Sequence, residues 1–172
     1  MARAGRKTGA SSSGGSAGGG GFALTVAAVG RGRGEPAQIL FDNYVARLPW
    51  PLRLVEIRES REATAGLKAA EGKKLAAAVP EGARVIALDP RGDTLSSEAF
   101  ARLLGDWRDS GVRDAAFFIG GADGLEPAIV KSATKVLSFG PMIWPHMLVR
   151  AMLAEQLWRA ASILSGHPYH RA

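Results

Sequence analysis

The fold class is decided by the segment Ala115-Ala116-Phe117-Phe118-Ile119-Gly120-Gly121-Ala122-Asp123-Gly124-Leu125-Glu126-Pro127. Its first five residues form a continuous apolar run, which is typical of a strand buried on both faces of a sheet. The glycines that follow let a ligand approach the backbone closely. Pro127 is tolerated in the first turn of a helix. Strand, glycine turn and helix in succession indicate an α/β protein, whose ligands bind at the carboxyl ends of the strands.

The same alternation extends in both directions along the chain. Apolar, β-compatible runs predict four further strands, and amphipathic or alanine-rich segments predict the helices between them. The strand at 85–88 is expected to stop at Asp89-Pro90. A largely parallel sheet in a single α/β domain follows. The further strands are expected at 24–29, 52–57, 85–88 and 136–139, and helices at 35–47, 62–78, 127–134 and 147–164.

One more helix is the clearest in the chain. Ser96 or Ser97 can cap it, and Gly111 ends it. An apolar stripe at i, i+3, i+4 and i+7 predicts that one side of this helix packs on the sheet. The stripe consists of Phe100, Leu103, Leu104 and Trp107.

Composition excludes several classes of protein. The 172 residues are 47% hydrophobic and 22% charged, as in globular domains. No apolar run approaches the ~18 residues of a membrane span. Cysteine is absent, which excludes disulfides, thiolate metal sites and cysteine nucleophiles and fits a cytoplasmic protein. The net charge of +6 suits an RNA partner but does not require one.

Residues 1–21 are mostly glycine, serine and alanine, with three basic residues and no acid. They cannot bury enough apolar surface to offset the entropy of ordering, so we expect a disordered tail ahead of a domain at 22–172. No apolar segment follows the basic residues, so a secretory signal is not expected. A vector-derived linker, a natural extension and a weak RNA-binding arm are all open interpretations.

Two glycine-rich loops compete as the cofactor site. The first, Gly30-Arg31-Gly32-Arg33-Gly34, follows the first strand, and Glu56 lies near the end of the second. This resembles a dinucleotide-binding turn, but the third glycine comes too early and arginines are unusual there. A mobile basic surface loop is the favoured interpretation. The second loop, 120–127, is either the cofactor site or a plain strand-to-helix turn, and its own residues do not decide between the two.

The C-terminal region concentrates basic and aromatic residues. All three histidines, His146, His167 and His170, lie in the last 27 residues, with Arg150 and Arg159 on the helix between them. Imidazoles and guanidinium groups beside glycine loops suit an RNA-facing active site. No metal site is expected, because no carboxylate or third ligand stands at a suitable spacing.

Four motifs in order resemble the ribosomal large-subunit methyltransferase H family over residues 22–172. They are the strand 85–88, Phe118-Ile119-Gly120-Gly121-x-x-Gly124-Leu125, Pro145-His146-x-x-x-Arg150 and the terminal His167-Pro168-Tyr169-His170-Arg171. The resemblance implies a SPOUT-type α/β knot, with a mostly parallel sheet of five or six strands and a C-terminal trefoil knot. It also implies methylation of N3 of a pseudouridine in helix 69 of bacterial 23S rRNA, using S-adenosyl-L-methionine and acting on assembled ribosomes as a homodimer.

The resemblance also assigns the site. The cofactor residues it implies are Leu88, Gly120, Phe139, Gly140, Pro141, Met142, Ile143 and Trp144. Arg159, Tyr169, His170 and Arg171 would hold the nucleotide and its phosphates. Replacing Gly120 by Val should block the pocket and leave the fold intact. No pocket carboxylate is evident as a general base, so His170, His146 and water are the candidates.

The dimer interface is expected on the long C-terminal helix, which is more apolar than a one-sided surface helix requires. The apolar residues of the helix are Met147, Leu148, Met152, Leu153, Leu157 and Trp158.

Two rival functions stand beside methyl transfer. One is a non-catalytic ribosome-binding protein with a degenerate pocket, and the other is a nicotinamide-dependent oxidoreductase that uses the Gly30 loop.

Overall fold

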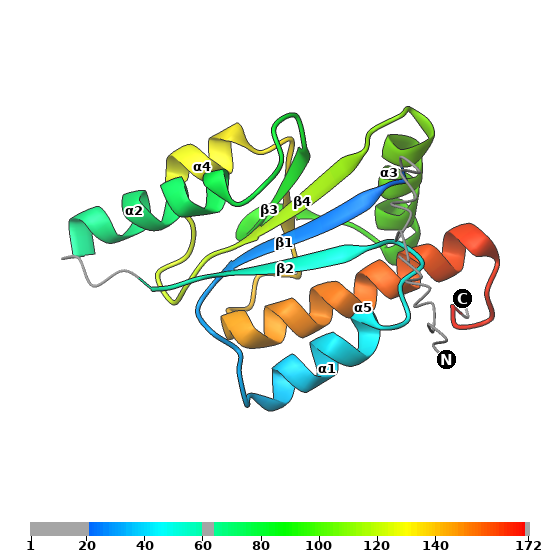
Figure 1. Cartoon of the computed structure of the whole chain (residues 1–172), viewed down its shortest axis with the longest axis horizontal. Helices are drawn as coiled ribbons and strands as arrows, with labels where there is room; N and C mark the ends of the chain where they lie inside the picture. Colours follow the sequence, from blue (N-terminus) through cyan, green and yellow to red (C-terminus); the bar gives the residue numbers. More distant parts are fainter. Residues whose placement is uncertain (1–20, 60–63, 171–172) are drawn as a thin grey trace, which may run out of the picture.

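In the residues that the computed structural model describes, 21–59 and 64–170, five parallel strands form one sheet in the order β2-β1-β4-β3-β5 (Figure 1). Helices α2 and α4 lie on one face, and α1, α3 and α5 on the other. The elements are β1 (Ala23–Val29), α1 (Pro36–Val45), β2 (Leu52–Ile57), α2 (Thr64–Ala77), β3 (Arg84–Thr94), α3 (Ser97–Asp109), β4 (Asp114–Ile119), α4 (Pro127–Ser132), β5 (Lys135–Ser138) and α5 (His146–Ser165). The expected parallel α/β architecture is confirmed.

The central strands β1 and β4 are apolar except at Thr25 and Asp114, as expected of strands that are covered on both faces. Phe117 packs in the core under α1, α3 and α5, whereas its neighbour Phe118 packs in the core under α2 and α4. Successive side chains of a strand point to opposite faces, so one apolar run supplies both cores. The interpretation of 115–119 as a doubly buried strand is therefore confirmed.

Helix α3 begins where the sequence offers a cap. The Ser96 hydroxyl accepts a hydrogen bond from the Ala99 N–H at 3.2 Å, so Ser96 and not Ser97 is the N-cap residue. Phe100 and Leu104 of its stripe are fully buried. The helix ends at the residues before Gly111, which has a positive φ of 86°.

Strand β3 does not stop at Asp89-Pro90, as the sequence suggested. It continues to Thr94, with a break in its pairing register after Leu88, and pairs with β5 again, Asp93 with Leu137 and Thr94 with Ser138. Gly92 permits this, because a Cβ there would lie 2.7 Å from the backbone carbon of Val136. The break between the two paired parts opens a loop beside the carboxyl end of β4, where the candidate site lies.

Helix α5 packs against both α1 and α3. Leu153 and Leu157, which we assigned to a subunit interface, are instead fully buried inside this chain. Leu148 is 41% exposed, and Met152 is partly exposed. Part of the apolar excess of α5 is therefore used within the subunit, and the rest remains on its surface.

Two further expectations concern the termini and the membrane. The tail at 1–21 lies outside the described residues except for Gly21. Within the described part of the chain, no helix has the length and apolar character that a membrane crossing requires.

Candidate active site

A cavity of ≈460 Å³ lies at the carboxyl ends of β3, β4 and β5. Its size suits a nucleoside-sized ligand. Three chain segments form it: the break in β3, the glycine loop after β4 and the loop between β5 and α5. Seven of the eight residues expected to bind the cofactor line it, and Pro141 does not; the seven are Leu88, Gly120, Phe139, Gly140, Met142, Ile143 and Trp144.

The glycine loop after β4 is a close-packed turn. Gly121 and Gly124 form an isolated bridge, and the Gly124 N–H donates to the Gly121 carbonyl at 3.0 Å. A Cβ on Gly120 would lie 2.5 Å from the Gly124 carbonyl carbon. The expectation that Gly120→Val leaves the fold intact is therefore wrong locally, since even a methyl group must displace the turn.

A buried carboxylate borders the cavity, which the sequence reasoning overlooked. Asp89 is 7% exposed and accepts from the Arg91 backbone N–H, Nε and Nη2, each at 2.9 Å. The Arg91 guanidinium lowers the pKa of Asp89, although burial acts to raise it. Asp89 therefore stays ionised at neutral pH and is a poor base. Its evident role is to fix the break in β3.

Arg150 is fully buried, so our expectation that it faces RNA is wrong. Its Nη2 donates to the carbonyls of Val29 and Gly30 at 2.8 and 2.9 Å. Its Nη1 contacts Glu56 Oε1 at 2.9 Å. Arg150 thus ties the carboxyl ends of β1 and β2 to the first turns of α5.

The Gly30–Gly34 loop is held by the same carboxylate. Glu56 Oε1 also accepts from the Gly32 N–H at 2.6 Å, and Gly30 and Gly32 are buried. The interpretation of this loop as mobile is therefore wrong at these two glycines. Because the Gly32 N–H is occupied, the loop does not offer it to a dinucleotide phosphate.

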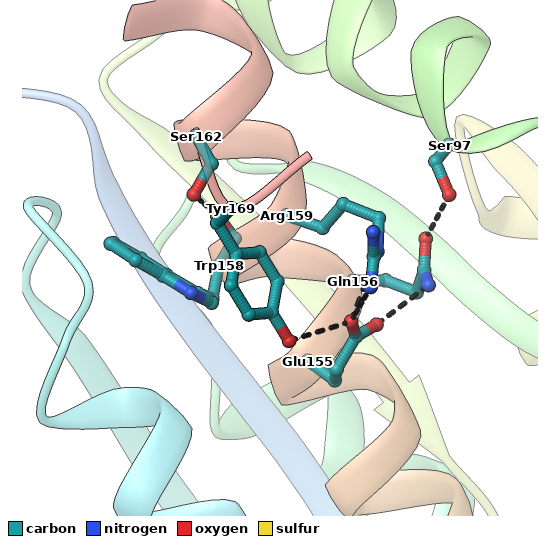
Figure 2. A network of polar contacts seen from close by, with 7 residues as sticks. All are labelled: Ser97, Glu155, Gln156, Trp158, Arg159, Ser162 and Tyr169. Atoms are coloured by element: carbon teal, nitrogen blue, oxygen red, sulfur yellow. Dashed lines mark hydrogen bonds and ion pairs between the residues drawn. The ribbon is translucent and has the colours of Figure 1, made fainter. Parts of the chain in front are cut away.

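The C-terminal tail folds back along α5 and meets a cluster around Glu155. Figure 2 shows Tyr169, Arg159 and Gln156 converging on this carboxylate. The Tyr169 hydroxyl donates at 3.1 Å, Arg159 Nε at 3.0 Å and Gln156 Nε2 at 2.7 Å. His170 Nε2 lies 3.0 Å from Glu98 Oε1. Tail and helix are thus linked by charge-assisted hydrogen bonds.

Burial raises the pKa of Tyr169 to about 12, and its contacts with Tyr44 and Glu155 act in the same direction. The phenol is therefore protonated at neutral pH and acts as a donor. Hydrogen bonding to Glu155 raises the pKa of Arg159, so the guanidinium also keeps its charge. Neither group is suited to take a proton from a substrate.

The structure separates the two halves of the expected site. Tyr169, His170 and Arg159 do not line the cavity, and Arg171 lies outside the described residues. Glu155, to which the tail binds, follows His146 by nine residues, or about 14 Å along the helix. Of the three histidines only His146 lines the cavity. The prediction that the three histidines gather beside the glycine loops is therefore wrong within one chain.

A second cavity of ≈530 Å³ lies between α1 and α5, and we call it the α1–α5 groove. Apolar helix side chains line most of it, including Leu40, Tyr44, Leu148 and Met152. It shares the residues 137–140 with the first cavity, so a molecule in the groove would lie against the loop between β5 and α5.

The geometry contains no metal centre in the described part of the chain, where no three histidine or acidic side chains are arranged to hold an ion. The candidate site is thus a glycine-lined cavity with a basic and aromatic tail outside it.

A family model described as "Predicted SPOUT methyltransferase" matches residues 22–170. The chain belongs to the SPOUT methyltransferase family.

This SPOUT methyltransferase has curated relatives of nearly its own length. The "Ribosomal RNA large subunit methyltransferase H" of Rhodospirillum centenum is 59% identical over 151 residues, 87% of this chain and 99% of the relative. The protein of the same name from Paramagnetospirillum magneticum is 56% identical over 149 residues, 86% and 98% of the two chains. The match excludes the N-terminal tail and little else.

Solved structures agree on the fold of this SPOUT methyltransferase. A probable methyltransferase from Bordetella pertussis has a TM-score of 0.50 at 14% identity and covers 83% of this chain and 97% of its own. A probable methylase family protein from Haemophilus influenzae has a TM-score of 0.51 at 12% identity, covering 87% and 70%. At this identity the likeness concerns the fold alone.

Two groups of site residues escaped the sequence reasoning. Lys68, Asp89 and Arg91 line the cavity, but nothing local marks them as a group. Glu155 could have been found, because Glu155 and Arg159 are four residues apart in a long helix, a spacing at which opposite charges pair.

Proposed function

We propose that this SPOUT methyltransferase methylates N3 of a pseudouridine in helix 69 of 23S rRNA, on the assembled ribosome and in the cytoplasm, with S-adenosyl-L-methionine as methyl donor. The observation that carries the proposal is the cavity where three loops meet. The names of the curated relatives support the substrate class, ribosomal RNA of the large subunit.

The cavity fits the proposed cofactor. Gly120 lines the cavity, and its lack of a side chain lets the turn pack closely there, since a Cβ would lie 2.5 Å from the Gly124 carbonyl carbon. Leu88, Met142 and Ile143 would hold the adenine through apolar contact, and glycine backbone groups would satisfy its polar edge. S-adenosyl-L-methionine supplies an electrophilic methyl group when bound. The residues around it contribute positioning and the exclusion of water, which are worth up to about 7–11 kcal/mol for a well-oriented reaction.

A proton must leave the imide nitrogen during methyl transfer. Asp89 is a poor acceptor because its pKa is lowered. Tyr169 is itself protonated. His146 lines the cavity and His170 lies in the tail, so these imidazoles and water are the acceptors that we retain.

We further propose that the active site is completed by a second copy of the chain. The tail does not reach the cavity of its own chain, and the α1–α5 groove next to the cofactor loop is apolar. A partner in this groove would bring its own tail to the cavity. Trp158 Nε1 and His170 Nδ1 are buried without a hydrogen-bond partner among the described residues. Each such unsatisfied atom typically lowers the stability of a protein by ~1–3 kcal/mol. A rearrangement of the tail in the dimer that gave these atoms hydrogen-bond partners would lower the free energy.

The trefoil knot expected of the family belongs to the same proposal. Membership of the SPOUT methyltransferase family supports it.

Methyl transfer is tested with radiolabelled cofactor and ribosomes from a strain that lacks the modification. We expect label in 23S rRNA, at one pseudouridine of helix 69. Cofactor binding without any transfer would favour the non-catalytic ribosome-binding protein. Binding of a nicotinamide cofactor instead would favour the oxidoreductase, which the occupied Gly32 N–H already disfavours.

The dimer is tested at the α1–α5 groove. Leu148→Glu places a charge on its exposed apolar wall, so we expect a monomer by light scattering at micromolar concentration, where the wild type is a dimer. Ala76→Glu introduces the same charge on the exposed side of α2 and should leave the dimer intact. A monomeric wild type would contradict the proposal.

A further inference from the structure

The Gly30–Gly34 loop is held in a defined conformation, although it does not line the proposed cofactor cavity. Gly30 and Gly32 are buried, whereas Gly34 is exposed. A Cβ on Gly30 would lie 2.9 Å from His146 Nε2, and one on Gly32 would meet Met147 at 2.6 Å. Arg31 and Arg33, between and after these glycines, are exposed. The alternation holds the backbone against α5 and presents two guanidinium groups to solvent.

Buried and partly buried side chains hold the loop backbone in place through hydrogen bonds. Arg150 holds the Val29 and Gly30 carbonyls, and Glu56 holds the Gly32 N–H. The carboxylate of Glu56 is already paired with Arg150. It is therefore compensated, and adds no net negative charge beneath the loop.

Among the described residues, the two arginines have no ionic or hydrogen-bonding partner for their side chains. Neither Arg31 nor Arg33 forms an ion pair or side-chain hydrogen bond with any residue in 21–59 or 64–170, although Glu35 follows directly in the sequence. This differs from Arg91, Arg108 and Arg159, which are all paired with acids. Two unpaired guanidinium groups on a fixed backbone form a ready site for an anionic polymer.

The position of the loop identifies the kind of anion. Figure 1 shows the turn after β1 beside the start of α5, at the end of the sheet where the strands finish. His146 contacts Gly30 on one side and lines the cofactor cavity on the other. A nucleotide in that cavity would carry its neighbouring phosphates past this rim, and arginine forks match phosphate geometry.

We propose that Arg31 and Arg33 bind the phosphodiester backbone of the RNA substrate and that Arg150 and Glu56 fix them in place. This rests on the proposed function, which supplies the RNA. The contact is to phosphate, so it adds affinity and register but no base specificity.

The test is the double variant Arg31→Ala/Arg33→Ala, with ribosomes lacking the modification as the probe. We expect the KM for ribosomes to rise about tenfold or more near physiological salt, because two phosphate contacts are lost. The slope of log affinity against log salt should become shallower by about 1.5. The kcat at saturating ribosomes and the affinity for S-adenosyl-L-methionine should not change.

Two comparison variants isolate the cause. Arg84→Ala/Arg113→Ala removes the same charge from exposed positions at the opposite ends of β3 and β4, and should behave as the wild type. Arg31→Lys/Arg33→Lys keeps the charge and should restore most of the salt slope. An unchanged KM and slope in the double alanine variant would overturn the inference, as would an equal loss in the Arg84/Arg113 variant. A wild type that does not methylate ribosomes would instead overturn the proposed function.

Discussion

Gly120→Ala is expected to weaken the binding of S-adenosyl-L-methionine by about 100-fold or more and to abolish methyl transfer. A Cβ at this position meets the backbone of Gly124 and Leu125 at 2.5 and 2.8 Å. Backbone in a hydrogen-bonded turn yields less readily than a flexible side chain, so the turn that lines the cavity must be distorted. Calorimetry with the cofactor measures the loss directly.

Gly121→Ala is the matched comparison. Its Cβ would meet side chains and no backbone, Val29 at 3.1 Å and Glu71 Oε2 at 3.8 Å, so a smaller loss is expected from the same chemical change one residue away. Ile143→Glu gives a second test with little risk to folding, since Ile143 lines the cavity and is 82% exposed. Its carboxylate should also impair binding. Normal cofactor affinity in folded Gly120→Ala would place the cofactor elsewhere.

The sequence predicted best what depends on near neighbours. The apolar run at 115–119 predicted strand β4, and the stripe around Phe100 and Leu104 predicted helix α3 and its buried side. Both patterns are local, because burial of a strand or helix face follows from the spacing of apolar residues. The resemblance to known methyltransferases then singled out eight loop and strand residues, seven of which line one cavity, and no local pattern could have grouped them.

Two of the errors share one physical cause, which is pairing over a long distance in the chain. Asp89-Pro90 looks like the end of a strand, but β3 resumes because Gly92 lets it approach β5. Arg150 looks like a surface charge, but its partners Glu56 and Gly30 stand 94 and 120 residues away. Such burial is invisible to periodicity, because the compensating groups lie in other elements.

Deleting Tyr169 to Ala172 is expected to abolish methylation of ribosomes and to spare cofactor binding and dimerisation. The tail contacts Glu155 and Trp158 and does not line the cavity, so its loss leaves the cofactor loops in place. A frayed terminus ordinarily tolerates deletion. Full methyl transfer by the truncated protein would show that the tail only covers α5, and the role of Arg159 would fall with it.

Point variants separate the contributions within the tail. Tyr169→Phe removes the hydrogen bond to Glu155 but keeps the ring that lies 5.0 Å from the Arg159 guanidinium carbon. If the ring stacks on a base of the RNA, this variant should keep most of its activity, whereas Tyr169→Ala should not. Equal activity of both variants would argue against a stacking role.

A heterodimer decides whether the tail serves its own cavity or that of its partner. One subunit carries Gly120→Ala and a complete tail, and the other carries an intact cavity and lacks residues 169–172. If the tail works across the dimer, the one intact cavity meets the one intact tail, and about half of the wild-type activity should return. If it works within its own chain, neither subunit is complete and no activity should return. The distance of the tail from its own cavity favours the first outcome, since a tail held at Glu155 lies some nine residues along α5 from His146. Each variant alone should be inactive, so any recovered activity must come from combined subunits.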